Sequence, residues 1–367
     1  MDLELLDRTL AGHGQPAFRA RQVWEWLARG AKGYEEMTNL PAALRAALAD
    51  EVPLSSLTLE HEAHASDGTV KALFSTADGR PVEAVLMRYR DGRRSLCLSS
   101  QSGCPLTCTF CATGTMKFGR NLTASEILDQ ALHFRRMTEV DHCVFMGMGE
   151  PMMNLDNVLA ACGRLPDLGI ASRRTAISTV GWVPGILRLA DSPLPIRLAL
   201  SLHAPDDALR SQIMPVNERY PLEQVLEACE EFYEAKRRRI FVEYVMLAGV
   251  NDRYEQAVAL AEVLAACEAH YERKRRQIFI EYVMLAGVND SYAQAVQLAQ
   301  RLDPRIFKVN LIPYNPTGSV YEGSGREAIA AFREALESRG VEATVRLTRG
   351  RDIDAACGQL AAKAAAA

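Results

Sequence analysis

The segment Ser99-Ser-Gln-Ser-Gly-Cys104-Pro-Leu-Thr-Cys108-Thr-Phe-Cys111 spaces three cysteines as Cys-x3-Cys-x2-Cys. It follows the short apolar stretch Ser95–Ser99, which is typical of a β-strand. Three thiolates on one loop suit a soft metal centre, and iron–sulfur clusters are held by cysteine thiolates. We therefore expect Cys104, Cys108 and Cys111 to bind an iron–sulfur cluster, with one iron left open for a ligand that carries an amine and a carboxylate.

Zinc and coincidence are the competing interpretations of this cysteine motif. Structural zinc sites usually show paired Cys-x2-Cys motifs or a fourth Cys or His ligand close by. No histidine lies between His64 and His133. This absence favours the cluster over zinc.

Short apolar strands alternate with amphipathic helices from about residue 94 onward. We expect helices at Ala124–Met137 and Leu155–Leu165, among others. The expected strands are Ser95–Ser99, Asp141–Met146, Arg174–Thr179, Arg197–Leu202, Ile240–Leu247, Ile278–Leu285 and Phe307–Ile312. This alternation predicts an α/β fold with a parallel sheet that can curl into a barrel. In such folds the active site lies at the carboxyl ends of the strands.

The first 90 residues have a different pattern of apolar and polar residues, which predicts a small accessory unit. Arg19–Gly30 and residues 42–50 have helical patterns, and Thr69–Phe74 and Pro81–Tyr89 resemble two short strands around the turn Asp78-Gly79. The expected division is an accessory domain at 1–90, a core at 91–348 and a C-terminal tail at 349–367.

A tandem repeat is visible within the core. Residues 226–263 and 264–301 match at 27 of 38 positions, and both contain EYVMLAGVND. Each copy has the pattern helix, strand, turn and the start of a further helix. Two copies are too few for a solenoid, so the repeat indicates duplication of one strand–helix unit.

The overall composition excludes several classes of protein. The net charge of −4 gives no general attraction to nucleic acid or anionic membranes. The acidic start MDLELLDRTL lacks the features of a signal peptide, and no apolar run of about 18 residues indicates a membrane span. Nine cysteines without secretory features indicate a reducing compartment, so we expect a cytoplasmic protein.

The Cys-x3-Cys-x-Phe-Cys motif resembles the signature of the radical S-adenosylmethionine superfamily. From about residue 15 to 362, the chain resembles the dual-specificity adenine-C2 methyltransferases of 23S ribosomal RNA and transfer RNA. The resemblance implies a partial (βα)6-type barrel that binds a [4Fe–4S] cluster and S-adenosylmethionine. The cluster would pass an electron to the sulfonium and release a 5′-deoxyadenosyl radical.

The resemblance also implies a set of cofactor contacts at strand ends. Without it, these residues have plainer interpretations, such as a glycine turn, a satisfied polar group or the turn Tyr314-Asn315-Pro316. The implied contacts are Gly149, Glu150, Ser178, Ser201, Leu202, His203 and Asn315.

Two cysteines and one glutamate take catalytic roles by the same resemblance. Cys357 would take a methyl group from one S-adenosylmethionine, and the radical made from a second would activate that methyl for addition to the base. Cys97 would then resolve the protein–RNA adduct by forming a disulfide with Cys357, and Glu83 would act as acid or base. The plainer interpretations are buried cysteines and a solvated strand glutamate. Cys143, Cys162, Cys229 and Cys267 are expected to be structural.

RNA partners require local rather than global positive charge. Basic runs occur at Arg88–Arg94, Lys236–Arg239, Arg273–Arg276 and Arg346–Arg351, although each could be only a solvated face. The target base must be flipped out to reach a buried radical. The resemblance implies 23S ribosomal RNA and transfer RNA as substrates, an electron donor such as flavodoxin or ferredoxin, and a monomer.

Two other functions compete with C2 methylation. The related adenine-C8 methyltransferases, which confer antibiotic resistance, share the cluster motif and both cysteines. A non-catalytic iron–sulfur RNA-binding protein is the alternative from another class. It draws support from the repeat, because the family carries one copy of EYVMLAGVND. We expect one copy to occupy the barrel and the other to form an excursion outside it.

Overall fold

The computed structural model describes residues 1–244, 250–251, 278–284, 286–287, 289–302, 304–305, 307–313 and 322–345. The predictions for Cys267, Asn315 and Cys357, and for the basic runs at 273–276 and 346–351, fall outside these residues. Within them, no helix is long and apolar enough to cross a bilayer.

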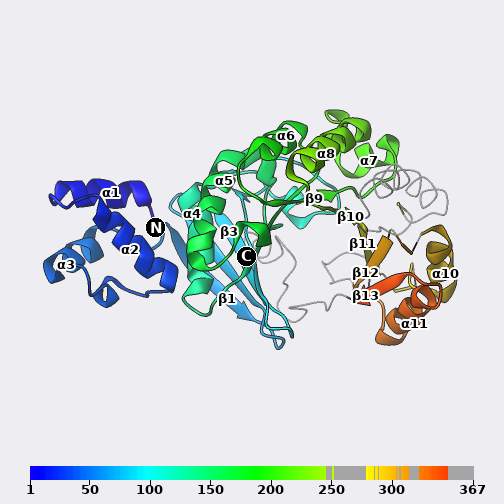
Figure 1. The fold of residues 1–367 in the computed structure, drawn as a ribbon, viewed down its shortest axis with the longest axis horizontal. Coiled ribbons are helices and arrows are strands. Elements are labelled where there is room, and N and C mark those ends of the chain that lie inside the picture. Colours follow the sequence, from blue (N-terminus) through cyan, green and yellow to red (C-terminus); the bar gives the residue numbers. More distant parts are fainter. Residues whose placement is uncertain are drawn as a thin grey trace.

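Three helices form the N-terminal part of the chain. They are α1 (Leu3–Gly12), α2 (Phe18–Arg29) and α3 (Ala42–Glu51), with a single 3-10 turn η1 (Tyr34–Glu36). Helices α2 and α3 were predicted, whereas α1 was not. Figure 1 shows the three helices grouped beside α4. The indole nitrogen of Trp24 donates to Asp167 at 2.7 Å and ties α2 to the rest of the protein.

One sheet of eleven strands runs through the described residues. Its first four strands are antiparallel neighbours, and every neighbouring pair from β4 to β13 is parallel. In spatial order the strands are β1 (Leu57–His64), β2 (Val70–Thr76), β3 (Pro81–Arg88), β4 (Arg94–Cys97), β7 (His142–Phe145), β8 (Thr175–Thr179), β9 (Arg197–Ser201), β10 (Ile240–Tyr244), β11 (Ile278–Met284), β12 (Phe307–Pro313) and β13 (Glu342–Val345). The α/β fold with parallel strands is therefore confirmed. All seven predicted core strands are present, and β13 and β1 are additional. A separate two-stranded pair joins β5 (Gln101–Ser102) to β6 (Arg120–Asn121).

Helices follow most of the parallel strands and line the outer side of the curved sheet (Figure 1). Helix α4 begins with a capping box, in which Thr123 and Glu126 each bond to the other's backbone N–H. The helices are α4 (Ala124–Arg135), α5 (Leu155–Arg164), α6 (Val183–Asp191), α7 (Asp207–Ile213), α8 (Leu222–Lys236), α10 (Tyr292–Arg301) and α11 (Arg326–Glu337). The 3-10 turns η2 to η6 are Ala112–Thr115, Pro151–Asn154, Leu165–Leu168, Ser172–Arg174 and Pro215–Glu218.

The two repeat copies each contribute a strand to the sheet. Strand β10 pairs with β9 on one side and with β11 on the other, and β11 pairs with β12. Glu243 lies in register with Glu281, and Tyr244 with Tyr282. The expectation that one copy lies outside the barrel is therefore wrong. Each copy carries a run of apolar and aromatic residues suited to a central strand, and insertion pairs both of its edges.

The apolar core divides between the two repeat copies. Among the described residues, one cluster of buried side chains extends from Met1 to Tyr244 and packs the N-terminal helices, α4 to α6 and α8 against the sheet. A second cluster extends from Ile280 to Ala343 and includes α10 and α11. The boundary between them coincides with the β10–β11 pairing. The domain division at residue 90 stays a prediction, although β1 to β3 continue the same sheet as the core.

Candidate active site

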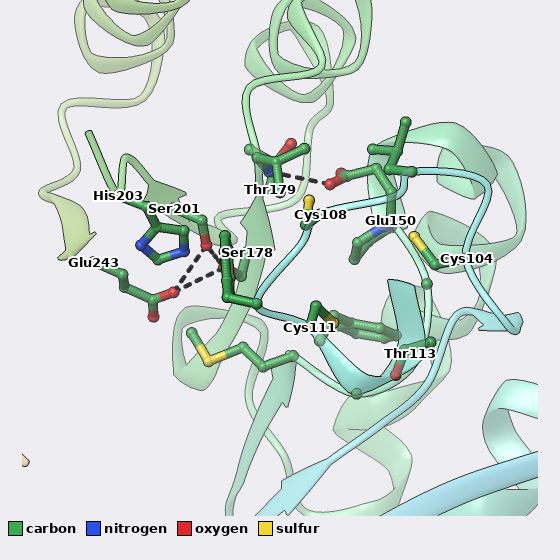
Figure 2. Close-up of a pocket in the computed structure, with 18 residues that line it drawn as sticks. Cys104, Cys108, Cys111, Thr113, Glu150, Ser178, Thr179, Ser201, His203 and Glu243 are labelled. Carbon is green, nitrogen blue, oxygen red and sulfur yellow. Dashed lines mark hydrogen bonds between the residues drawn. The ribbon is translucent and has the colours of Figure 1, made fainter. Parts of the chain in front are cut away.

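The cysteine loop lies beyond the carboxyl end of β4, as predicted. The backbone N–H of Thr109 donates to the carbonyl of Ile213 at 3.0 Å, which ties the loop to the end of α7. The ring of Phe110 meets the His203 ring edge to face, with centroids 4.8 Å apart. Cys104, Cys108 and Cys111 line a single pocket (Figure 2).

Each of the three thiols can supply one thiolate ligand to a cluster. Burial raises the pKa of Cys104 and of Cys108 to about 12. Bound metal reverses this preference, because a coordinating thiol loses its proton. Within the described residues, no three His, Cys, Asp or Glu side chains converge on one ion position. A [4Fe–4S] cluster needs no such convergence, since each thiolate binds a different iron.

Gly149 and Glu150 follow β7 and line the same pocket. Gly149 has a φ of 95°, and a Cβ there would overlap the side chain of Gln101, so the turn requires glycine. The carboxylate of Glu150 accepts hydrogen bonds from the backbone N–H groups of Met152 and Val180, each at 3.0 Å. Burial raises the pKa of Glu150 to about 7. A ligand ammonium group beside it would favour the ionised carboxylate.

Ser178 and Ser201 end neighbouring strands and share one carboxylate, that of Glu243. Glu243 Oε2 accepts from Ser178 Oγ at 3.1 Å and from Ser201 Oγ at 3.2 Å, and the two hydroxyls lie 3.3 Å apart (Figure 2). The sequence reasoning missed Glu243. Its strand was predicted, however, and a polar residue within a run of apolar residues was the available signal.

Leu202 and His203 follow Ser201 and are both buried. His203 lines the pocket, whereas Leu202 does not; the Leu202 N–H donates to the carbonyl of Glu243 at 2.9 Å. Burial lowers the pKa of His203 to about 3, so the imidazole is neutral. Asn251 Nδ2 donates to the His203 carbonyl at 2.7 Å. The first repeat copy thus holds this strand end.

A second residue missed from the sequence, Arg210, ties these strand ends together. Its guanidinium is fully buried and donates to the carbonyls of Leu202, at 3.2 Å, and Val180. A third bond, of 2.7 Å, goes to Asn217 Oδ1. Arg210 therefore fixes the loops after β8 and β9, next to Ser178 and Ser201.

Cys97 and Glu83 share one face of the sheet. Cys97 in β4 lies opposite Val85 in β3, and side chains alternate along a strand, so Glu83 points to the same side as both. Both residues are buried. The Glu83 carboxylate pairs with Lys71 Nζ at 3.0 Å. The interpretation of Glu83 as a solvated strand residue is therefore wrong, while its acid–base role stays a prediction.

The other cysteine assignments within the described residues agree with the structure. Cys143 is buried in β7, Cys162 in α5 and Cys229 in α8. Two basic runs are described as well. Arg93 pairs with Asp91 at 2.7 Å and Arg237 with Glu234 at 2.7 Å. Such local pairs are compatible with a solvated face, and an RNA contact there stays a prediction.

Sequence comparisons match nearly the whole length of the chain. The chain is 43% identical over 371 residues to a probable dual-specificity RNA methyltransferase RlmN of Thermus thermophilus, covering 98% of this chain and 93% of the relative. It is 40% identical over 378 residues to the dual-specificity RNA methyltransferase RlmN of an Anaeromyxobacter species, covering 99% and 90%. The chain belongs to the RlmN family of dual-specificity RNA methyltransferases. The predicted family is confirmed.

Family models and a solved structure agree with membership of the RlmN family. Residues 98–261 match the radical SAM superfamily, and residues 1–53 match the ribosomal RNA large subunit methyltransferase N-terminal domain. The crystal structure of a radical SAM methyltransferase from Sphaerobacter thermophilus is 39% identical, with a TM-score of 0.76, and covers 98% of this chain and 97% of its own. Superfamily membership implies a [4Fe–4S] cluster and S-adenosylmethionine.

Proposed function

We propose that this chain methylates C2 of an adenine in 23S ribosomal RNA and C2 of the adenine 3′ of the anticodon in transfer RNA. The observation that carries the proposal is one pocket, lined by Cys104, Cys108, Cys111 and by polar residues at the ends of successive strands. The RlmN family membership of the whole chain supports the same activity.

The pocket residues divide into cluster ligands and S-adenosylmethionine contacts. Cys104, Cys108 and Cys111 would hold the [4Fe–4S] cluster, which supplies one electron for reductive cleavage of S-adenosylmethionine. Glu150 would accept hydrogen bonds from the ammonium group of the methionine end, near the cysteine loop. The hydroxyls of Ser178 and Ser201, with Glu243 behind them, offer donors and acceptors for further polar groups of the cofactor. Gly149, Leu202, His203 and Asn315 complete the proposed contacts.

Three residues would act on the RNA. Cys357 carries the methyl group, and Glu83 accepts the proton that C2 loses. Cys97 closes a disulfide with Cys357, which breaks the carbon–sulfur bond of the adduct, and the methylene left on the base takes up a proton to become the methyl group. One S-adenosylmethionine supplies the methyl group and a second the radical, so two are used in each turnover. Support comes from family membership and from the shared sheet face of Cys97 and Glu83.

The remaining parts of the proposal concern partners and organisation. We propose a monomer that works in the cytoplasm and receives electrons from flavodoxin or ferredoxin. Residues 1–90 would form an RNA-binding accessory unit, 91–348 the core and 349–367 a tail that carries Cys357. The match of residues 1–53 to the ribosomal RNA methyltransferase N-terminal domain supports the first of these units.

The decisive experiment is anaerobic reconstitution of the chain with iron and sulfide, then incubation with S-adenosylmethionine, reductant and unmodified 23S ribosomal RNA. Mass spectrometry would follow 5′-deoxyadenosine, S-methyl-Cys357 and the methylated base. We expect 2-methyladenosine from the wild type and none from Cys108→Ala. Cys143→Ala, which removes a buried cysteine outside the pocket, is the matched control and should retain activity.

Two results would contradict the proposal. Formation of 8-methyladenosine would assign the chain to C8 methylation. A cluster that forms without producing 5′-deoxyadenosine would indicate a non-catalytic iron–sulfur RNA-binding protein.

A further inference from the structure

Lys71 is a fully buried lysine in strand β2 to which the proposed mechanism gives no role. Its side chain has an exposed fraction of 0%, and that of its ion-pair partner Glu83 is 3%. Lysine is almost never fully buried unless it is paired. Burying both charges costs free energy that an apolar pair of similar volume would avoid. The position of the pair therefore needs a reason other than packing.

The strand register places this pair on the face that carries Cys97. Val85 in β3 lies opposite Lys71 on one side and opposite Cys97 on the other. Glu83 is two residues from Val85 and so points to the same face. The opposite face of β3 carries Val82, Ala84 and Leu86, which belong to the large apolar core. The ion pair thus lies on the reactive side of the strand.

The backbone of Glu83 is held by the segment that follows β4. Ser99 Oγ donates to the Glu83 carbonyl, and Ser99 lies two residues after Cys97. Ser99 Oγ also accepts from the N–H of Met148, in the glycine-rich segment after β7, at 2.8 Å. With the backbone of Glu83 fixed to the cysteine loop region, the remaining freedom of the carboxylate is its side-chain rotamer. The 3.0 Å bond from Lys71 fixes that rotamer.

We propose that Lys71 is a positioning residue that aims the Glu83 carboxylate at the proton lost from adenine C2. The inference rests on the proposed function and deepens it. The proton leaves C2 of the base and ends on a carboxylate oxygen of Glu83. Lys71 keeps its own proton throughout and donates a hydrogen bond to the carboxylate. By strand register, Lys71 in β2, Cys97 in β4 and His61 in β1, which lies opposite Leu73, are on the Glu83 face of the described sheet, whereas Arg88 in β3 belongs to the opposite face.

The roles of Lys71 and Glu83 can be tested because one step of the reaction needs them and an earlier step does not. Methylation of Cys357 does not involve the C2 proton, whereas release of the methylated base does. The variants are Lys71→Met, Lys71→Arg, Glu83→Gln and the double variant Lys71→Met/Glu83→Gln. Each is assayed for S-methyl-Cys357, for 5′-deoxyadenosine, for the covalent protein–RNA adduct and for 2-methyladenosine.

We expect Lys71→Met to form S-methyl-Cys357 and, within a single turnover, 5′-deoxyadenosine at close to the wild-type rate. Its rate of 2-methyladenosine formation should fall about 100-fold, within the range for loss of general acid–base catalysis, and the adduct should accumulate. Lys71→Arg keeps the charge and the donor, so it should recover part of the rate. The double variant should be no slower than Glu83→Gln, since the two residues act as one unit.

Lys308→Met is the matched control, because it breaks the Lys308–Glu342 ion pair between β12 and β13, at the far end of the sheet. It should not accumulate adduct. If Lys71→Met fails to fold, the double variant, which leaves no unpaired buried charge, is compared with Glu83→Gln, and a double variant clearly slower than Glu83→Gln overturns the role of Lys71.

The outcomes separate the two proposals. A wild type that makes no 2-methyladenosine overturns the proposed function and this inference together. A productive wild type whose Lys71→Met variant is equally productive, or loses Cys357 methylation in the same proportion, overturns only the role of Lys71.

Discussion

Strands β10 and β11 come from the two copies of one repeat, yet they contact different parts of the molecule. Strand β10 lies against β9 and its Glu243 reaches the pocket, whereas β11 lies against β12. In a sheet with one copy, a single strand would have both neighbours. The duplication has divided these contacts, so that the first copy keeps the side facing the active site and the second keeps the side facing the C-terminal strands.

Where both copies are described, they share one strand–turn contact. The Tyr244 hydroxyl donates to the carbonyl of Asn251 at 3.2 Å, and the Tyr282 hydroxyl donates to the carbonyl of Asn289 at 2.9 Å. The sequence of the repeat therefore determines this strand–turn contact wherever the copy lies.

The surroundings of the two tyrosines differ. Tyr244 belongs to the large core cluster, while Tyr282 belongs to the second cluster. The ring centroids of Tyr282 and Phe332 are 5.0 Å apart. The comparison teaches that local sequence fixes the strand and its turn, whereas position in the sheet decides which copy can take part in chemistry.

The largest expected effect comes from removing the second copy, residues 264–301. Because the copies match so closely, β10 should then pair directly with β12. The strand that leads to Asn315 would move toward β9 by one strand spacing, about 4.8 Å. Since errors of about 1 Å in a catalytic group can cost about 100-fold, we expect formation of 5′-deoxyadenosine to rise by about 100-fold.

The measurement is the rate of 5′-deoxyadenosine formation by the reconstituted shortened chain, with circular dichroism to verify folding. A shortened chain that folds but cleaves S-adenosylmethionine no faster would show that the extra strand does not displace the site.

The next largest effect is expected from substituting Glu243 and Glu281, the equivalent glutamates of the two copies. Glu243→Gln weakens the shared acceptor of Ser178 and Ser201, and bonds to a charged group contribute about 1.5 to 3 kcal/mol. We expect the dissociation constant for S-adenosylmethionine to rise by about 10- to 100-fold, measured by calorimetry. Glu281→Gln is the matched control, at the same register position one strand farther from the serines. Equal weakening by both variants would contradict the division of roles between the copies.

The smallest effect concerns the feature that both copies share. Tyr244→Phe and Tyr282→Phe each remove one buried hydroxyl bond, with an expected loss of about 1 kcal/mol in the free energy of unfolding. Urea unfolding at equal protein concentration would measure both losses. A difference between the variants well beyond that value would mean that the turns are not equivalent in energy.

Much of the core could be predicted from the sequence because its signals are local. Apolar strands alternate with amphipathic helices, and this pattern gave the strands of the core within a few residues. The weaker pattern of Leu57–His64, mostly polar and exposed at the sheet edge, did not indicate β1. The position of the second copy could not be predicted, because pairing of β10 with β11 depends on contacts between strands and not on the sequence of either.

The candidate site shows the same difference between signals that are local in the sequence and contacts between distant residues. The cysteine spacing pointed to Cys104, Cys108 and Cys111 without a structure, since chemistry and spacing are both local. Glu243 and Lys71 were missed because each becomes informative only through a partner distant in the sequence. Lys71 is an ordinary strand lysine until Glu83 lies 3.0 Å away.

The matched register of β10 and β11 has a consequence for how such sheets can grow. Residues of one strand align with the equivalent residues of its copy, so the added strand offers each neighbour the hydrogen-bonding pattern that the original strand offered. A parallel sheet can in this way gain a whole strand by a single in-frame duplication. The sequence of the second copy can then diverge, because its strand lies on the side of the first copy away from the cysteine loop.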